Sequence, residues 1–173
     1  IISNPNGRLF YSDEDKIDEA GKRLEPFFKP DWNERLFYEQ NFISHLGVYK
    51  RDIMEEIGGF REGFEGAQDH DLALRFIHRI SPDQIIHIPM ILYHWRILEG
   101  STAMGAGEKS YALTASEKAI DEALQNRGKA AEVHPLTEFG YVKTRFNEPA
   151  RKPLVSIIIP TRDGLDVLEP CID

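Results

Sequence analysis

The sequence has few of the features that mark secreted, membrane-spanning or nucleic-acid-binding proteins. It contains one cysteine, Cys171, so an internal disulfide is excluded and a reducing environment is indicated. Its unbroken apolar runs span only a handful of residues, far short of the roughly 20 that a membrane-spanning helix needs. Lysine and arginine number 21 against 29 aspartates and glutamates, which argues against a nucleic-acid partner.

The sequence does contain enough apolar residues for a packed domain. Hydrophobic residues make up 41% of the 173 positions. The chain does not start with methionine, no secretion signal is recognisable, and its last residues read as the inside of a helix, so we expect a segment of a longer protein. We expect a cytoplasmic location, and peripheral association with the inner face of the cell membrane stays open.

Apolar periodicity and glycine or proline punctuation predict an α/β fold. The acidic stretch "DEDKIDEAGKR" (13–23) is predicted to be a charged loop. Strands are predicted over 8–12, 43–50 and 84–95, the last of them either bent or divided into two strands at Pro89. Helices are predicted over 51–59, 69–80 and 108–127, and a hairpin from 130–134 and 140–146.

The segment 154–160, "LVSIIIP", has apolar residues at nearly every position, which is typical of a strand covered on both faces. A glycine-containing turn and a helix follow it, which is how an α/β domain begins. We expect this strand to dock on the sheet near 84–95, either within one chain or exchanged between two chains of a dimer.

Two acids, Asp69 and Asp71, stand at the expected start of a helix, directly after a glycine-rich loop. Aspartate favours such positions because it accepts bonds from free helix N–H groups and interacts with the positive end of the helix dipole. A carboxylate there can also act as a general base if it faces a cleft. Their spacing alone does not decide between the two roles.

Two further groups of polar residues are candidates for ligand binding. Asp13 and Asp15 are weak candidates for a divalent metal, and a solvated acidic loop is the alternative. His94 and Arg96 follow an apolar strand, where they could serve a metal or phosphate, or lie on the surface.

The sequence resembles family 2 glycosyltransferases of the GT-A fold, in particular large bacterial enzymes with tandem family-2 domains that build cell-surface polysaccharides such as O-antigen. The resemblance is carried by "YSDEDKID", "FKPDWN", "SHLGVYK", "IGGFREGFEGAQDHDLALR", "HIPMILYHWR", "GSTA" and "PLVSIIIPTRDGLDVLEPCID", in that order. It implies a partial GT-A (Rossmann-like) fold. Residues 1–105 would be the acceptor-side half of one domain, 106–152 a helix-and-hairpin linker, and 153–173 the start of a second domain.

The resemblance also implies roles for single residues. Asp69 matches the general base of the family, with Gln68 where glutamate is common and Asp71 as helix cap or support. The metal-binding D-x-D of the family would lie upstream, so Mg or Mn is expected in the complete enzyme and not on this segment. The further site residues we expect are Gly59, Phe60, Gln68, Trp32 and Trp95 toward the acceptor, His94 and Arg96 near phosphate or metal, and Pro160, Thr161 and Asp163 toward the nucleotide of the second domain.

The expected activity is transfer of a sugar, with inversion, from a nucleotide-diphosphate sugar to a glycan acceptor, and the segment alone should be inactive. One alternative is a non-catalytic carbohydrate-binding module that stacks sugars on Trp32, Trp95 and Phe60. The other is a metal-dependent phosphohydrolase that uses Asp13 and Asp15.

Overall fold

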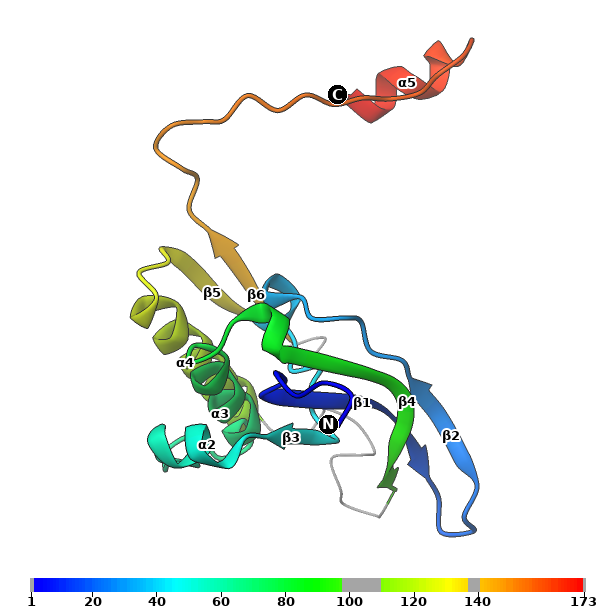
Figure 1. The fold of residues 1–173 in the computed structure, drawn as a ribbon. Coiled ribbons are helices and arrows are strands. Elements are labelled where there is room, and N and C mark those ends of the chain that lie inside the picture. Colours follow the sequence, from blue (N-terminus) through cyan, green and yellow to red (C-terminus); the bar gives the residue numbers. More distant parts are fainter. Residues whose placement is uncertain (1, 98–109, 137–140, 173) are drawn as a thin grey trace.

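The computed structural model describes residues 2–97, 110–136 and 141–172, and it confirms the α/β class (Figure 1). The main sheet is built around its longest-paired strand, β1. β4 runs parallel to β1 along its whole length, so β4 occupies one edge of that strand. On the other edge, β3 pairs antiparallel with the beginning of β1 and β2 with its end. The four strands are β1 (Leu9–Ile17), β2 (Arg23–Phe27), β3 (Gly47–Tyr49) and β4 (Ile85–Arg96).

Helices and a hairpin complete the body of the structure. The hairpin of β5 and β6 forms a second, two-stranded sheet. Helix α4 packs against both α3 and the hairpin, as Figure 1 shows. The elements are α1 (Glu34–Phe37), α2 (Arg51–Glu56), α3 (Gln68–Ile77), a 3-10 turn (Pro82–Gln84), α4 (Ser110–Asn126), β5 (Ala131–Leu136), β6 (Tyr141–Phe146) and α5 (Leu165–Ile172).

One hydrophobic core joins the sheet to these helices. Leu9 and Tyr11 of β1 lie in the same buried cluster as Phe76 of α3. Ile120 of α4 and Val142 of β6 belong to that cluster as well. The segment that the sequence marks as a helix and hairpin between two domains is therefore packed into the body of the fold.

The charged loop predicted over 13–23 is wrong at both of its ends. β1 continues through Asp13–Ile17, and Arg23 begins β2. Asp13, Glu14 and Asp15 are buried side chains. Sequence patterning treats consecutive acids as solvent-exposed, whereas these three are accommodated because cationic and histidine side chains pair with each of them.

The other predicted elements differ mainly in their ends. The strand expected over 43–50 is confined to Gly47–Tyr49, while the three predicted helices and the hairpin are present. Pro89 does not divide β4, because the pairing with β1 shifts register between Ser12 and Asp13, opposite Ile88 and Ile91. A proline is tolerated at such an irregularity because its missing N–H is not needed there.

Within one chain, the predicted docking of 154–160 on the sheet is wrong, and the alternative exchange between two chains stays a prediction. These residues form no strand and lie free of both sheets, and Figure 1 shows the segment leaving the body of the structure before α5. Leu154 and Ile158 are 97% and 91% exposed. The apolar run indicates that the segment needs to be covered, but it does not indicate which surface covers it. In the described structure, the segment does not pair with β4.

Gly66 is the glycine that the packing of α4 requires. Its φ is +88°, and a Cβ there would lie 2.8 Å from the Cβ of Ala112 and from the Cε2 of Tyr111. Gly21 has a similar φ of +80° but open space around it. Comparing alanine at Gly66 with alanine at Gly21 therefore separates the cost of a left-handed backbone from the cost of a steric clash.

We predict that Gly66→Ala lowers the free energy of unfolding more than Gly21→Ala does. Both variants place alanine in a left-handed conformation at a cost of about 1–2 kcal/mol. Only Gly66→Ala also pushes α4 away from α3, which should add about 1–3 kcal/mol, as overpacking does. Urea denaturation of both variants measures the difference, and equal losses would contradict the close packing at Gly66.

Candidate active site

Asp69 lies in the first turn of α3 with its carboxylate held by two donors. Its Oδ2 accepts a hydrogen bond from Nδ2 of Asn41 at 2.9 Å, and its Oδ1 accepts one from the backbone N–H of His70 at 2.9 Å. The N-cap residue is Ala67, which provides no side-chain cap. Asp69 thus satisfies one amide of the first helical turn and is also fixed by a residue 28 positions away.

A cleft of about 350 Å³ opens beside Asp69. Trp95 at the end of β4 lines the same cleft, so two of the site residues predicted from the sequence come together. Cleft volumes of 300–1,000 Å³ are usual for small-molecule sites. The lining residues are Glu39, Gln40, Asn41, Ser44, Gly66, Ala67, Asp69, His70, Trp95, Ser116, Tyr141 and Val142.

Asp71 has a structural environment, and it is not a helix cap. Its carboxylate is 1% exposed and forms ion pairs with Arg61 at 2.5 Å and with Arg75 at 2.9 Å. Arg75 also donates to the carbonyl oxygens of Ile57 and Gly59. Asp71 therefore ties the glycine-rich loop to α3, while Asp69 faces the cleft.

The segment 41–45 connects Asp69 to the end of β4. Oδ1 of Asn41 accepts a bond from the backbone N–H of Ser44 at 3.3 Å, and Oγ of Ser44 lies 3.0 Å from Nδ1 of His45. The His45 ring stacks on Tyr93 with centroids 4.7 Å apart and lies 5.2 Å from the ring of Trp95. The segment thus places Asn41 against Asp69 and the His45 ring against Trp95.

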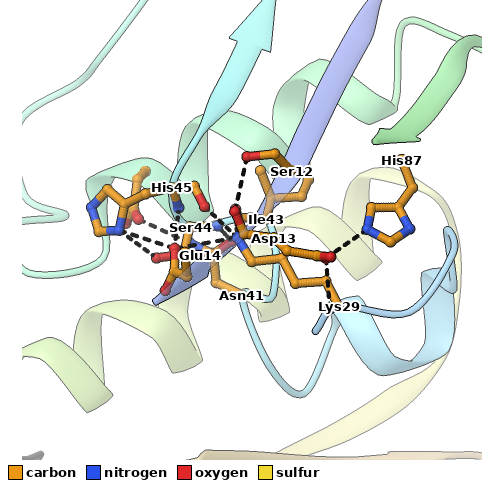
Figure 2. A network of polar contacts seen from close by, with 10 residues as sticks. Ser12, Asp13, Glu14, Lys29, Asn41, Ile43, Ser44, His45 and His87 are labelled. Carbon is orange, nitrogen blue, oxygen red and sulfur yellow. Dashed lines mark hydrogen bonds and ion pairs between the residues drawn. The ribbon is translucent and has the colours of Figure 1, made fainter. Parts of the chain in front are cut away.

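A buried ion pair holds this segment in place. Figure 2 shows Lys29 and Glu14 meeting beside Ile43, Ser44 and His45. Nζ of Lys29 lies 3.3 Å from Oε2 of Glu14 and donates to the carbonyl oxygens of Ile43, at 2.8 Å, and of His45. Glu14 also accepts a bond from the backbone N–H of His45 at 3.1 Å. The Lys29 ammonium and the Glu14 carboxylate together bind three backbone groups of the turn, two carbonyl oxygens and one N–H.

The Glu14 carboxylate is stabilised in its charged form. Burial by itself would raise the pKa of Glu14, but hydrogen bonds from His45 and Lys29 outweigh that effect and hold the pKa below its usual value. The Lys29 side chain is fully buried. The pair is therefore an internal charge pair whose partners depend on each other.

Asp13 and Asp15 do not fit a Mg or Mn site. Asp13 accepts from the backbone N–H of Lys29 at 3.0 Å and contacts Nε2 of His87 at 2.9 Å. Asp15 is bound by Arg23 at 2.5 Å and by His94. Hard divalent cations need free oxygen ligands, whereas Oδ1 of Asp13 and both carboxylate oxygens of Asp15 already contact nitrogen groups. No cluster of three or more His, Cys, Asp or Glu side chains within 2–97, 110–136 and 141–172 could hold a metal ion.

His94 lies away from the cleft. Side chains alternate along a strand, so His94 faces away from its neighbours Tyr93 and Trp95. Those two residues contact His45, whereas His94 contacts Asp15. Arg96 is the exposed last residue of β4, and it is not among the residues that line the cleft.

The remaining predicted site residues are also outside the cleft. Trp32 packs against Phe37 and Phe42 in the core, with centroids 5.1 and 5.8 Å away. Phe60 is exposed, and the carbonyl of Gly59 binds Arg75. Gln68 accepts a bond from the backbone N–H of Gly66. In the C-terminal segment, Pro160, Thr161 and Asp163 are exposed.

Sequence reasoning missed the residues that build the site around Asp69. Asn41, Ser44 and Lys29 belong to no catalytic motif. The contacts of Asn41 with Asp69 and of Lys29 with Glu14 join positions 28 and 15 residues apart. The one available signal was Lys29 in "FFKPDWN", a single lysine within an aromatic stretch. Tyr141 and Ser116 were missed because the segment that carries them was assigned to a linker.

Comparison with known proteins shows similarity over the full chain. No protein-family model matches it. Uncharacterized protein y4gI of Sinorhizobium fredii (strain NBRC 101917 / NGR234) is 45% identical over 174 residues, which cover all of this chain and 19% of that protein. O-antigen biosynthesis protein RfbC of Myxococcus xanthus is 41% identical over 177 residues, again all of this chain but 13% of that protein. The chain thus spans less than a fifth of the length of either relative.

None of the described helices is both long enough and apolar enough to cross a membrane.

We predict that Lys29→Met destabilises the fold by about 3–5 kcal/mol, the usual cost of leaving one member of a buried ion pair without its partner. The methionine keeps the length of the apolar side chain, so the change removes mainly the charge. Adding Glu14→Gln should recover part of the loss. Denaturant unfolding measures both, with the exposed Lys22→Met as control. A loss no larger than that of Lys22→Met would contradict the role of Lys29.

Proposed function

We propose that this chain is the acceptor-side part of an inverting glycosyltransferase of bacterial cell-surface polysaccharide synthesis. The observation that carries the proposal is the shared cleft of Asp69 and Trp95, which a fixed carboxylate and an aromatic side chain both line. The 41% identity to a protein named for O-antigen biosynthesis supports the same class of pathway. The substrates would be a nucleotide-diphosphate sugar and a glycan acceptor, with the reaction on the cytoplasmic side of the membrane.

In the proposed reaction, Asp69 acts as the general base. Its carboxylate takes the proton of an acceptor hydroxyl while the hydroxyl oxygen forms a bond to the anomeric carbon of the donor sugar. The bond from that carbon to the diphosphate oxygen breaks on the opposite face, and the diphosphate leaves with the electron pair, which inverts the anomeric centre. A carboxylate has about four lone-pair sites, and Asn41 and His70 occupy two of those on Asp69, so room remains for the acceptor hydroxyl.

Helix α3 and Asn41 supply the positioning that a base needs. Asp69 stands on a helix anchored through Asp71, Arg61 and Arg75, so its backbone is fixed relative to the glycine-rich loop. The bond from Asn41 fixes the rotation of the carboxylate. A general base acts efficiently when its oxygen is held within hydrogen-bond reach of the proton it removes.

The metal and nucleotide parts of the proposed enzyme are not assigned to the cleft. Mg or Mn would stabilise the leaving diphosphate, and residues outside those described here would hold it, because Asp13 and Asp15 are engaged by N–H donors. Within the proposal, residues 153–173 begin a second domain with Pro160, Thr161 and Asp163 toward its nucleotide. The 97% exposure of Leu154 agrees with a segment that further protein would cover.

A carbohydrate-binding module is the second candidate, because the same cleft would serve it. Retained glycan binding without any transfer by the complete protein would favour that module. The phosphohydrolase alternative is disfavoured, because the acidic pair that it needs is buried among histidine and arginine partners.

We predict that Asp69→Asn lowers turnover of the complete protein at least about 100-fold, the usual scale for loss of a general base. The amide has nearly the shape of the carboxylate but cannot accept the proton. Transfer of radiolabelled sugar to acceptor glycan measures the rate, and thermal unfolding confirms that the variant is folded.

The matched control for Asp69→Asn is Glu62→Gln, which neutralises an exposed carboxylate in the preceding loop. It should leave turnover within about twofold of the unchanged protein, because surface charges away from the reacting atoms have little effect. Near-normal turnover in Asp69→Asn would remove Asp69 from the role of base.

A further inference from the structure

The charged side chains that line the cleft, within the described part of the chain, are all acidic. Among the described residues that line it, Glu39 and Asp69 carry carboxylates, and none is lysine or arginine. The lining histidine, His70, is buried, and its Nε2 lies 2.8 Å from the carbonyl oxygen of Phe37. Burial lowers the pKa of His70, so the ring is neutral near pH 7 and adds no positive charge.

Both carboxylates are fixed at the cleft. The Oε1 of Glu39 accepts a bond from the backbone N–H of Thr144 at 3.2 Å, and the carbonyl oxygen of Glu39 accepts one from Val142 at 3.4 Å. Asp69 is held by the side-chain amide of Asn41. Because neither carboxylate is free to swing into solvent, each keeps its charge close to any ligand in the cleft.

We propose that the cleft binds an uncharged saccharide unit and rejects saccharides that carry carboxylate groups. The inference deepens the proposed function and rests on it, since it takes the ligand of the cleft to be a glycan. The charge pattern decides the class, because an anionic sugar would meet two like charges and no lysine or arginine among the lining residues that the structure describes.

The other lining groups suit a neutral sugar. Gln40, Asn41, Ser44 and Ser116 offer amide and hydroxyl groups to sugar hydroxyls. Trp95 provides an aromatic surface for the C–H face of a pyranose ring. A neutral ring needs no countercharge, so this set is sufficient for binding and orientation.

Tyr141 gives the hairpin a part in specificity. Tyr141 is the first residue of β6 and is 49% exposed. It lines the cleft together with its neighbour Val142 and with Trp95 of β4. Glu39 is held by the same strand, so β6 sets both the shape and the charge of that wall. The choice of sugar is thereby assigned to the packing of β6 on the body of the fold.

The test compares two trisaccharides of similar size on the complete protein, chitotriose as the neutral probe and trigalacturonic acid as the anionic one. Binding is followed by saturation-transfer NMR and by quenching of tryptophan fluorescence at low and high salt. We expect chitotriose to bind at least about tenfold more tightly at low salt, the scale of repulsion between fixed charges near a protein surface. Salt should narrow the difference by screening.

Three variants assign the effect to the cleft. Glu39→Gln keeps an acceptor for Thr144 but removes one charge, so it should reduce the preference for chitotriose over trigalacturonic acid several-fold. Glu62→Gln changes the net charge equally outside the cleft and should leave the preference unchanged. Trp95→Ala should abolish chitotriose binding.

Equal or tighter binding of trigalacturonic acid would overturn the inference, and so would a preference that Glu39→Gln does not change. Failure of both probes to bind at millimolar concentration would overturn it as well. These results are independent of the turnover of Asp69→Asn. A neutral-sugar preference with normal turnover in Asp69→Asn would defeat the catalytic proposal alone, and loss of turnover without the preference would defeat this inference alone.

Discussion

The ammonium group of Lys29 is the contact on which the candidate site depends. It is fully buried, pairs with Glu14 and binds the backbone carbonyls of Ile43 and His45. The turn that it fixes presents Asn41 to Asp69 and the His45 ring to Trp95. A buried charge of this kind contributes little net stability, because desolvation offsets the attraction. Its effect is to select one conformation of the segment beside the cleft.

The fold class and most of the elements follow from local patterning. The periodicity of α3 and α4 and the turn residues of the hairpin are local signals, and these elements are present within a few residues of the predicted ends. The acidic half of β1 could not be predicted in this way, because its burial depends on Lys29, Arg23 and three histidines supplied by other segments. The prediction that 154–160 docks within the chain was wrong for the opposite reason. Its apolar residues are a local feature of the sequence, whereas the surface that would cover them cannot be read from the segment itself.

The candidate site was predictable in its centre and not in its surroundings. Asp69 was selected through the resemblance to family 2 glycosyltransferases, because the spacing of the two aspartates alone does not separate a helix cap from a general base. Asp71 has the same residue type and nearly the same position, yet two arginines bury it. The three-dimensional contacts thus give the two aspartates different environments, which residue type and spacing alone do not. The two tryptophans also have different environments: Trp95 lines the cleft, and Trp32 packs against Phe37 in the core.

The most direct test of the account is a crystal structure of the complete protein with an acceptor oligosaccharide bound. The account predicts a sugar hydroxyl about 2.6–3.2 Å from the Asp69 carboxylate, the reach of a general base, with the same sugar ring against Trp95. An acceptor bound outside the cleft, or one whose hydroxyl groups all lie beyond hydrogen-bond reach of Asp69, would contradict it.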